Sequence, residues 1–165
     1  MGFKHIYSQA NYRINPTLGK INRLTFEFTN YSVWNSDNSF NERFNQLNYK
    51  MEFRTTAALV VVGTQNDVQL LYPISFTGKT PLPVGRYRYS TTCLLYNSGI
   101  RKLFNYFFGV AGGVFYNGEV KQIQTGFTVR KQPYLSFTMP FEYNKFHFPI
   151  NYGETTLFLI AQGLK

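Results

Sequence analysis

Apolar and polar residues alternate along much of this chain, so that every second residue belongs to the same group. The clearest run places Leu135, Phe137, Met139, Phe141 and Tyr143 at alternate positions. The same period appears in the segments 23–29, 46–54, 86–96, 102–116 and 122–130. Successive side chains of a β-strand point to opposite faces of its sheet, so this period predicts six strands with one apolar and one polar face.

Residues that favour turns separate these runs. Asn117-Gly118 is the strongest hairpin signal, because both residue types tolerate the positive φ of a two-residue type I′ turn. With the weaker runs included, strands are expected to begin near residues 3, 21, 43, 57, 68, 86, 102, 119, 134 and 155. Residues 57–72 form either one strand or two. The fold class predicted is all-β, an antiparallel up-and-down meander over residues 1–165.

Alternation alone does not say which face of the sheet is the inside. A soluble barrel places its apolar face inward, and a membrane barrel places it outward. Phe, Tyr, Leu, Met and Ile fill the apolar positions, and four or five such residues from each of eight strands would overfill a narrow lumen. We therefore expect the sheet to form part or all of a transmembrane β-barrel. The alternative is a soluble β-barrel or sandwich that binds an apolar ligand.

The other face carries Ser, Thr, Asn, Gln and Gly with isolated charges. Water-exposed surfaces normally mix about 25–35% charged residues, so a neutral lining of this kind suits an enclosed, water-filled lumen. In the segment 86–96 the apolar face is predicted to hold Tyr87, Tyr89 and Cys93. The charges of the polar face predict a lumen charge network of Arg23, Glu27, Lys50, Glu52, Arg54, Arg86, Arg88, Arg130 and Glu142.

Strand length and aromatic residues also favour a membrane barrel. The predicted strands run for about 9–13 residues, enough to cross a bilayer at a tilt of about 45°. Aromatic girdles flank the apolar band of such barrels at both interfaces. The predicted interfacial aromatics, all near strand ends, are Tyr31, Trp34, Tyr87, Tyr116, Tyr134 and Tyr143.

Composition narrows the function classes further. Aromatic residues make up 19% of the chain and charged residues only 15%, a pattern that excludes intrinsic disorder. One cysteine excludes a disulfide scaffold. The net charge is +9, but the basic residues are scattered, so a nucleic-acid partner is not expected. The apolar run at 57–62 is far shorter than the roughly 18 residues of a membrane-spanning helix.

The order of motifs in the C-terminal half resembles a known family. Leu71-Tyr72-Pro73, Pro83-Val84-Gly85-Arg86-Tyr87, a Gly-x-Phe-Tyr-x-Gly piece at 113–118, Arg130-Lys131-Gln132-Pro133 and Phe148-Pro149 follow one another. This resembles the C-terminal outer-membrane β-barrel region of the Gram-negative family called domain of unknown function 5916. Its members carry an N-terminal domain similar to family-9 carbohydrate-binding modules.

The resemblance implies a barrel segment that anchors a carbohydrate-binding-like domain in the outer membrane and takes part in glycan handling. The chain has no recognisable export signal, and family members continue with further strands. We therefore expect a fragment of a longer protein. The expected partners are outer-membrane lipid, including lipopolysaccharide, and the remaining strands of the same protein or another outer-membrane protein.

Candidate catalytic chemistry is sparse. His5 and His147 are the only histidines, and neither has a second metal ligand at close spacing, so no metal and no cofactor are expected. Glu27, Glu52 and Glu142 share the polar face, where a carboxylate pair would serve glycoside hydrolysis. Ion pairs are the commoner role, and we assign no catalytic residue. A glycan hydrolase and a channel stay as alternatives.

Overall fold

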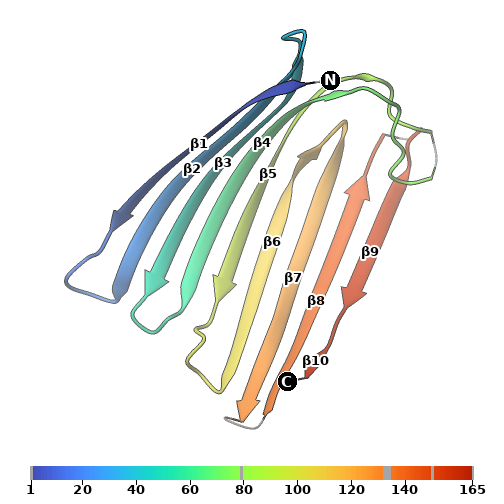
Figure 1. The fold of residues 1–165 in the computed structure, drawn as a ribbon. Coiled ribbons are helices and arrows are strands. Elements are labelled where there is room, and N and C mark those ends of the chain that lie inside the picture. Colours follow the sequence, from blue (N-terminus) through green and yellow to red (C-terminus); the bar gives the residue numbers. More distant parts are fainter. Residues whose placement is uncertain (1, 79, 132–134, 150, 165) are drawn as a thin grey trace.

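The computed structural model describes residues 2–78, 80–131, 135–149 and 151–164, which fold into one antiparallel sheet (Figure 1). Its strands are β1 (Phe3–Ile14), β2 (Ile21–Asn35), β3 (Phe40–Phe53), β4 (Ala58–Leu70), β5 (Gly85–Asn97), β6 (Phe104–Phe115), β7 (Gly118–Lys131), β8 (Leu135–His147), β9 (Glu154–Ile160) and β10 (Gly163–Leu164). From β1 to β9 each strand pairs with the next one in the chain. The predicted all-β, antiparallel up-and-down meander is confirmed.

The strands begin within a few residues of the predicted positions. Of the two alternatives for residues 57–72, the single strand is correct, because β4 continues from Ala58 to Leu70 without a break. Its turn-like residues Gln65, Asn66 and Asp67 stay in the ladder, since each pairs with a residue of both β3 and β5. Pairing on both sides supplies the hydrogen bonds that these residues would otherwise make in a turn.

The two edges of the sheet are unpaired. β1 pairs with β2 alone, and its twelve residues are all exposed. At the other edge β9 and then β10 pair with β8 along one register line, since Phe141 lies opposite Ile160 and Thr138 opposite Gly163. Within the described residues no ladder joins β1 to β9 or β10, so the sheet is open. Figure 1 shows β1 and β9 at opposite edges.

Cross-strand partners share a face of a sheet, so the register assigns every strand residue to one of two faces. We call one the belt face. One row of successive partners on it, from β1 to β9, is Tyr12, Phe26, Tyr49, Val61, Leu94, Val110, Ile123, Tyr143 and Phe158. We call the other the amide face. The neighbouring row on it is Asn11, Glu27, Asn48, Val62, Cys93, Ala111, Gln122, Asn144 and Leu157.

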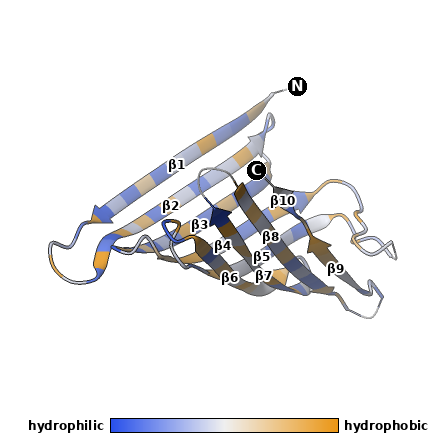
Figure 2. Cartoon of the chain, turned by 90° about the horizontal axis from the view of Figure 1, so that it is seen from below, coloured by the Kyte–Doolittle hydropathy of each residue, from blue (hydrophilic) through white to orange (hydrophobic). Residues whose placement is uncertain are grey.

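The sheet bends into an open trough with the amide face inside. Figure 2 shows the bend and, on β1 and β2, the alternation of hydropathy along a strand. The amide-face residues Phe115 and Phe146 converge with Phe76, which follows β4 in the chain, and with Phe148 beyond β8. Along β5 the belt-face residues from Arg86 to Leu94 are exposed and the amide-face residues between them partly buried, as the bend requires.

The register corrects the face predicted for residues 86–96. Tyr87 and Tyr89 lie on the amide face opposite Val68 and Asn66, while Arg86 and Arg88 lie on the belt face. Cys93 also moves to the amide face. Both faces of β5 carry apolar residues near its C-terminal end, so the alternation within this strand fits either orientation. The pairing of β5 with β4 and β6 decides which residues lie on which face. The other five alternating segments present the predicted face.

The hairpin at Asn117-Gly118 exists, but its turn residues are shifted by one position. Tyr116 and Asn117 form the turn, and Phe115 pairs with Gly118. Tyr116 adopts φ of +54°, in the left-handed region. Gly118 is needed for a different reason, because a Cβ there would collide with the carbonyl of His147 and the ring of Phe148.

Candidate functional site

The most extended surface feature is an apolar belt on the belt face. It consists of the row from Tyr12 to Phe158 and the next row, which is Ile14, Leu24, Met51, Leu59, Tyr96, Phe108, Thr125, Phe141 and Ile160. On β8 the apolar residues of this face continue beyond these two rows through Met139 and Phe137 to Leu135, so that the belt there spans nine residues, from Leu135 to Tyr143. Many of its side chains face outward without cover, including Leu94 (44% exposed), Ile123 (45%) and Phe158 (64%).

The same surface becomes polar toward one end of the strands. On β1 to β5, four residues along each strand from the first belt row, the belt face carries a polar row. This row is Ser8, Asn30, Asn45, Gln65 and Ser90. Within this row Asn30 Nδ2 donates to Asn45 Oδ1 at 2.6 Å. Charged residues follow farther out. The loop at 71–84, the longest connection between two strands in the described residues, lies at this end.

On the amide face, three predicted network members meet between β2 and β3. Glu52 accepts from Lys50 Nζ at 2.9 Å, and its other oxygen lies 3.9 Å from Arg23 Nη1. Arg23 Nε also donates to Asn15 Oδ1 at 3.2 Å. Glu27, on the same face, accepts from Asn11 rather than from a cation. All three ion-pair members are partly exposed, so these contacts organise the surface more than they stabilise it.

The remaining members of the predicted lumen charge network make contacts separate from this group and, apart from Arg86 and Arg88, from one another. Glu142 accepts from the amides of Gln122 and Asn144 on the amide face, at 2.7 and 2.8 Å. Arg130 is on the amide face and donates to the carbonyl of Ile100 at 2.7 Å. Arg54 lies in the turn after β3, where it donates to the carbonyl of Thr17 at 2.6 Å. The charges therefore form local contacts and not one continuous network.

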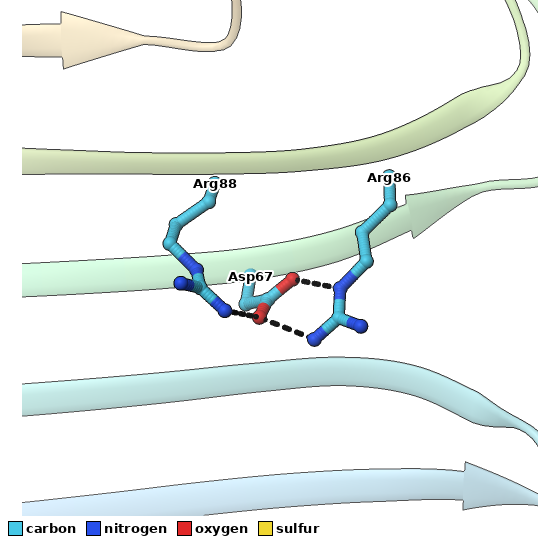
Figure 3. Close-up of polar contacts among 3 residues, drawn as sticks. All are labelled: Asp67, Arg86 and Arg88. Carbon is cyan, nitrogen blue, oxygen red and sulfur yellow. Dashed lines mark hydrogen bonds and ion pairs between the residues drawn. The ribbon is translucent and has the colours of Figure 1, made fainter.

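Arg86 and Arg88 meet on the belt face at Asp67, which sequence analysis did not select (Figure 3). Arg86 donates through Nε and Nη2 to the two carboxylate oxygens at 2.7 and 2.6 Å, and Arg88 Nη2 donates to Oδ2 at 3.1 Å. Asp67 lies outside the apolar belt, six residues along β4 from Val61. The hydrogen bond from Arg86, followed by that from Arg88, lowers the pKa of Asp67 to about 2 although burial opposes this.

A second charged group lies at the same end of the belt face, on β7 to β9. Lys121 is directly opposite Lys145, a like-charge pair that is unfavourable in a sheet. Glu154 offsets it, with its Oε2 3.4 Å from Lys145 Nζ and 3.5 Å from His147 Nδ1. The contact with His147, followed by that with Lys145, lowers the pKa of Glu154. Lys121, Lys145 and His147, together with Glu119, border a hollow of about 210 Å³.

The predicted interfacial aromatics divide between the two faces. Trp34 lies on the belt face in register with Lys4, and Tyr143 lies in the apolar belt itself. Tyr31 and Tyr87 are on the amide face, opposite Phe44 and Val68. Tyr116 is in the β6–β7 turn. Tyr134 lies outside the described residues.

An aromatic cluster lies on the amide face near the 71–84 loop. Phe76 contacts the rings of Phe115, Tyr116 and Phe148 at centroid distances of 5.3, 5.1 and 5.9 Å. Leu82 is 2% exposed and pairs through its backbone with Ile74. The loop is therefore folded over the amide face by apolar contact. The Leu71-Tyr72-Pro73 and Phe148-Pro149 motifs flank this cluster in sequence.

The described residues contain no group of three His, Cys, Asp or Glu side chains that could hold a metal ion. Glu52 and Glu142 belong to β3 and β8, and each has its own partners. His5 is on the amide face, opposite Val33, and His147 is on the belt face. In the same part of the chain, no helix has the length and apolar character that crossing a membrane requires.

Comparison with known proteins adds no relative: no protein-family model, curated protein or solved structure was found to match the chain. The resemblance to the family called domain of unknown function 5916 stays a prediction.

Proposed function

We propose that this chain is part of the wall of a transmembrane β-barrel, with its belt face against lipid and its amide face toward water. The observation that carries the proposal is the apolar belt. It extends over nine consecutive strands, and it lies on the convex, exposed side of the sheet. The nine-residue span of β8 from Leu135 to Tyr143, with five belt-face residues, is close to the length of about 9–11 residues that a tilted strand needs to cross a bilayer.

Burial favours this proposal over a soluble barrel or sandwich. A soluble domain of this length would bury its large apolar residues in a core. Among the described residues no side chain is below 2% exposure, and Phe26, Phe108 and Phe158 are at least 40% exposed. In a bilayer these side chains would lie in hydrocarbon, and the membrane-spanning part of each strand would be its belt portion alone.

The open edges support the expectation of partner strands. Unpaired backbone groups cost several kcal/mol each in hydrocarbon, so a membrane sheet has to close. Antiparallel pairing makes β1 and β9 point in the same direction. An antiparallel closure therefore requires an odd number of additional strands, which we expect from another part of the same protein or from another outer-membrane protein. An outer-membrane location and a carbohydrate-binding-like neighbour domain depend on the family resemblance alone.

The orientation of the faces can be tested with two adjacent residues of β7. In a background with Cys93→Ala, single cysteines are introduced as Ile123→Cys and Gln122→Cys, and each is labelled with an environment-sensitive fluorophore. After reconstitution into phosphatidylcholine vesicles, brominated acyl chains should quench the label at position 123 and an aqueous quencher the label at position 122. Equal behaviour of the two labels, or the reverse pattern, would overturn the proposal.

A further inference from the structure

Asp67 and three arginines form a cationic cluster on the belt face. Arg43 and Arg88 are the direct cross-strand partners of Asp67 in β3 and β5, and Arg86 is two residues from Arg88 on the same face. The Asp67 side chain is 5% exposed, whereas those of Arg86 and Arg88 are 51% and 65% exposed. The carboxylate is therefore covered while the guanidinium groups stay accessible.

The cluster has more positive charge than its own carboxylate can neutralise. Three guanidinium groups against one carboxylate leave two positive charges. Arg86 uses Nε and Nη2 for Asp67, and Arg88 uses one nitrogen, so both retain free donors. Arg43 makes no ion pair within the described residues. Its Cζ and that of Arg86 lie 5.8 and 4.3 Å from the centroid of the Phe40 ring, which holds the two side chains beside one another.

The level of the cluster fits the headgroup layer of a bilayer. Arg43 is four residues from Leu47, where the exposed apolar side chains of β3 begin. Along a strand tilted by about 45°, four residues rise about 9 Å. The headgroup layer adds about 5–7 Å outside the hydrocarbon core, and long arginine side chains reach several ångströms toward it.

We propose that this cluster binds the phosphate group of an anionic lipid headgroup, an inference that rests on the proposed function. Guanidinium groups recognise phosphate through paired hydrogen bonds, and two uncompensated charges match a phosphate monoester. Free phosphate would meet the same donors. The lipid is favoured because the cluster stands on an open face, directly above the belt, where acyl chains of the same molecule find apolar cover.

Trp34 gives a local readout, because it is the only tryptophan and pairs with Phe40 on the belt face. The full chain is reconstituted in phosphatidylcholine bilayers with a small fraction of pyrene-labelled phosphatidic acid or pyrene-labelled phosphatidylcholine. Energy transfer from Trp34 should report a preference for phosphatidic acid. Arg43→Gln and Arg88→Gln keep the bidentate pair of Arg86 with Asp67 and should each lower this preference about fivefold, equivalent to about 1 kcal/mol per basic side chain.

Arg13→Gln is the matched control, since it removes one charge from the amide face and should leave the preference unchanged. One outcome is that the wild type inserts into bilayers without phosphatidic acid but shows equal energy transfer from Trp34 to both probe lipids. This outcome would overturn the inference while the proposed function stands. Failure to insert into any bilayer would overturn the proposed function itself. Arginine-dependent binding of inorganic phosphate in detergent, with no preference for phosphatidic acid in bilayers, would assign the cluster to free phosphate and overturn the lipid proposal.

Discussion

The belt face and the amide face are made by the same strands, and adjacent residues differ sharply between them. Ile123 and Gln122 are neighbours in β7, yet the row through Ile123 is apolar or aromatic on all nine strands. The row through Gln122 holds Asn, Gln and Glu on β1–β3, β7 and β8. In a soluble sandwich the more apolar face would be the shielded one. Here it is the more exposed side, and this inversion is the main argument for a lipid environment.

The contrast between the faces varies along the sheet. On β4 to β6 the amide face carries small or apolar residues, among them Val62, Cys93 and Ala111 in one row. Charged and amide residues return on β7 and β8, where Gln122 and Glu142 are hydrogen bonded. The polar residues of the amide face are therefore concentrated on β1–β3 at one side of the trough and on β7 and β8 at the other. The substitutions that follow test the difference between the two faces, beginning with the one expected to have the largest effect.

Ile123→Arg should have the largest effect. A charge on the lipid-facing surface of a barrel costs about 2–4 kcal/mol at the bilayer midplane and less toward the interfaces, whereas at a residue 45% exposed to water the same change would be nearly neutral. The matched control, Gln122→Arg, places the charge on the amide face and should cost little. Urea unfolding in phosphatidylcholine vesicles measures both. Similar small losses in the two variants would contradict a lipid-facing belt.

Gly118→Ala should cost up to about 3 kcal/mol, because the added Cβ collides with backbone of the residues that end β8. Gly63 is the control, since a Cβ at this position on the belt face meets nothing within 4 Å. Gly63→Ala should leave the unfolding midpoint near that of the wild type. Equal sensitivity of the two glycines would show that strand packing at Gly118 is looser than described.

Asp67→Asn should remove about 2 kcal/mol at neutral pH together with the acid sensitivity of this cluster. The folded-state pKa of Asp67 is about 2 and the unfolded value is about 3.9, so its stabilisation is complete above about pH 4 and is lost as the pH falls toward 2. The unfolding midpoints of wild type and variant should therefore differ at about pH 6 and converge at about pH 2. Asp37→Asn is the control in an exposed turn, where Ser39 lowers the pKa of the carboxyl through hydrogen bonds. A constant difference between Asp67→Asn and wild type at both pH values would rule out this titration.

Phe76→Ala should have the smallest effect on global stability, about 1 kcal/mol, because the side chain is 38% exposed and its ring contacts are few. Its effect on the loop at 71–84 should be larger, since Phe76 holds that loop on the amide face. Limited proteolysis should cut this loop faster in the variant, with Leu18→Ala in the exposed β1–β2 turn as control. Unchanged cleavage would mean that other contacts hold the loop.

Periodicity was sufficient to predict the strands and, in five of six segments, their faces. It failed for β5, where Leu94, Leu95 and Tyr96 follow one another and both alternations fit. Pairing between strands shows which of the two alternations of β5 lies on the belt face. A single sequence does not report which residues of neighbouring strands lie opposite one another. Arg86 and Arg88 were assigned to the wrong face for that reason, and Asp67 was overlooked because its partners lie 19 and 21 residues away. A lone aspartate inside a strand was the one signal that pointed to it.

Turn chemistry was also only partly predictable. Asn117-Gly118 located the hairpin, but the glycine serves a close approach to His147 while Tyr116 takes the positive φ. Contacts of this kind depend on the neighbouring β8–β9 connection, which lies about thirty residues further along the chain. Local sequence therefore gives the position of the turn and not the backbone conformation of each residue.

If the proposed barrel closes around the Phe76 cluster, the position of this cluster would affect what can pass. In a closed barrel, a solute entering from the end of the 71–84 loop would meet packed rings before it reached the hydrogen-bonding groups of the wall. Passage would then require the rings to separate, and ions, which keep their hydration shells, would be held back more strongly than flat apolar molecules.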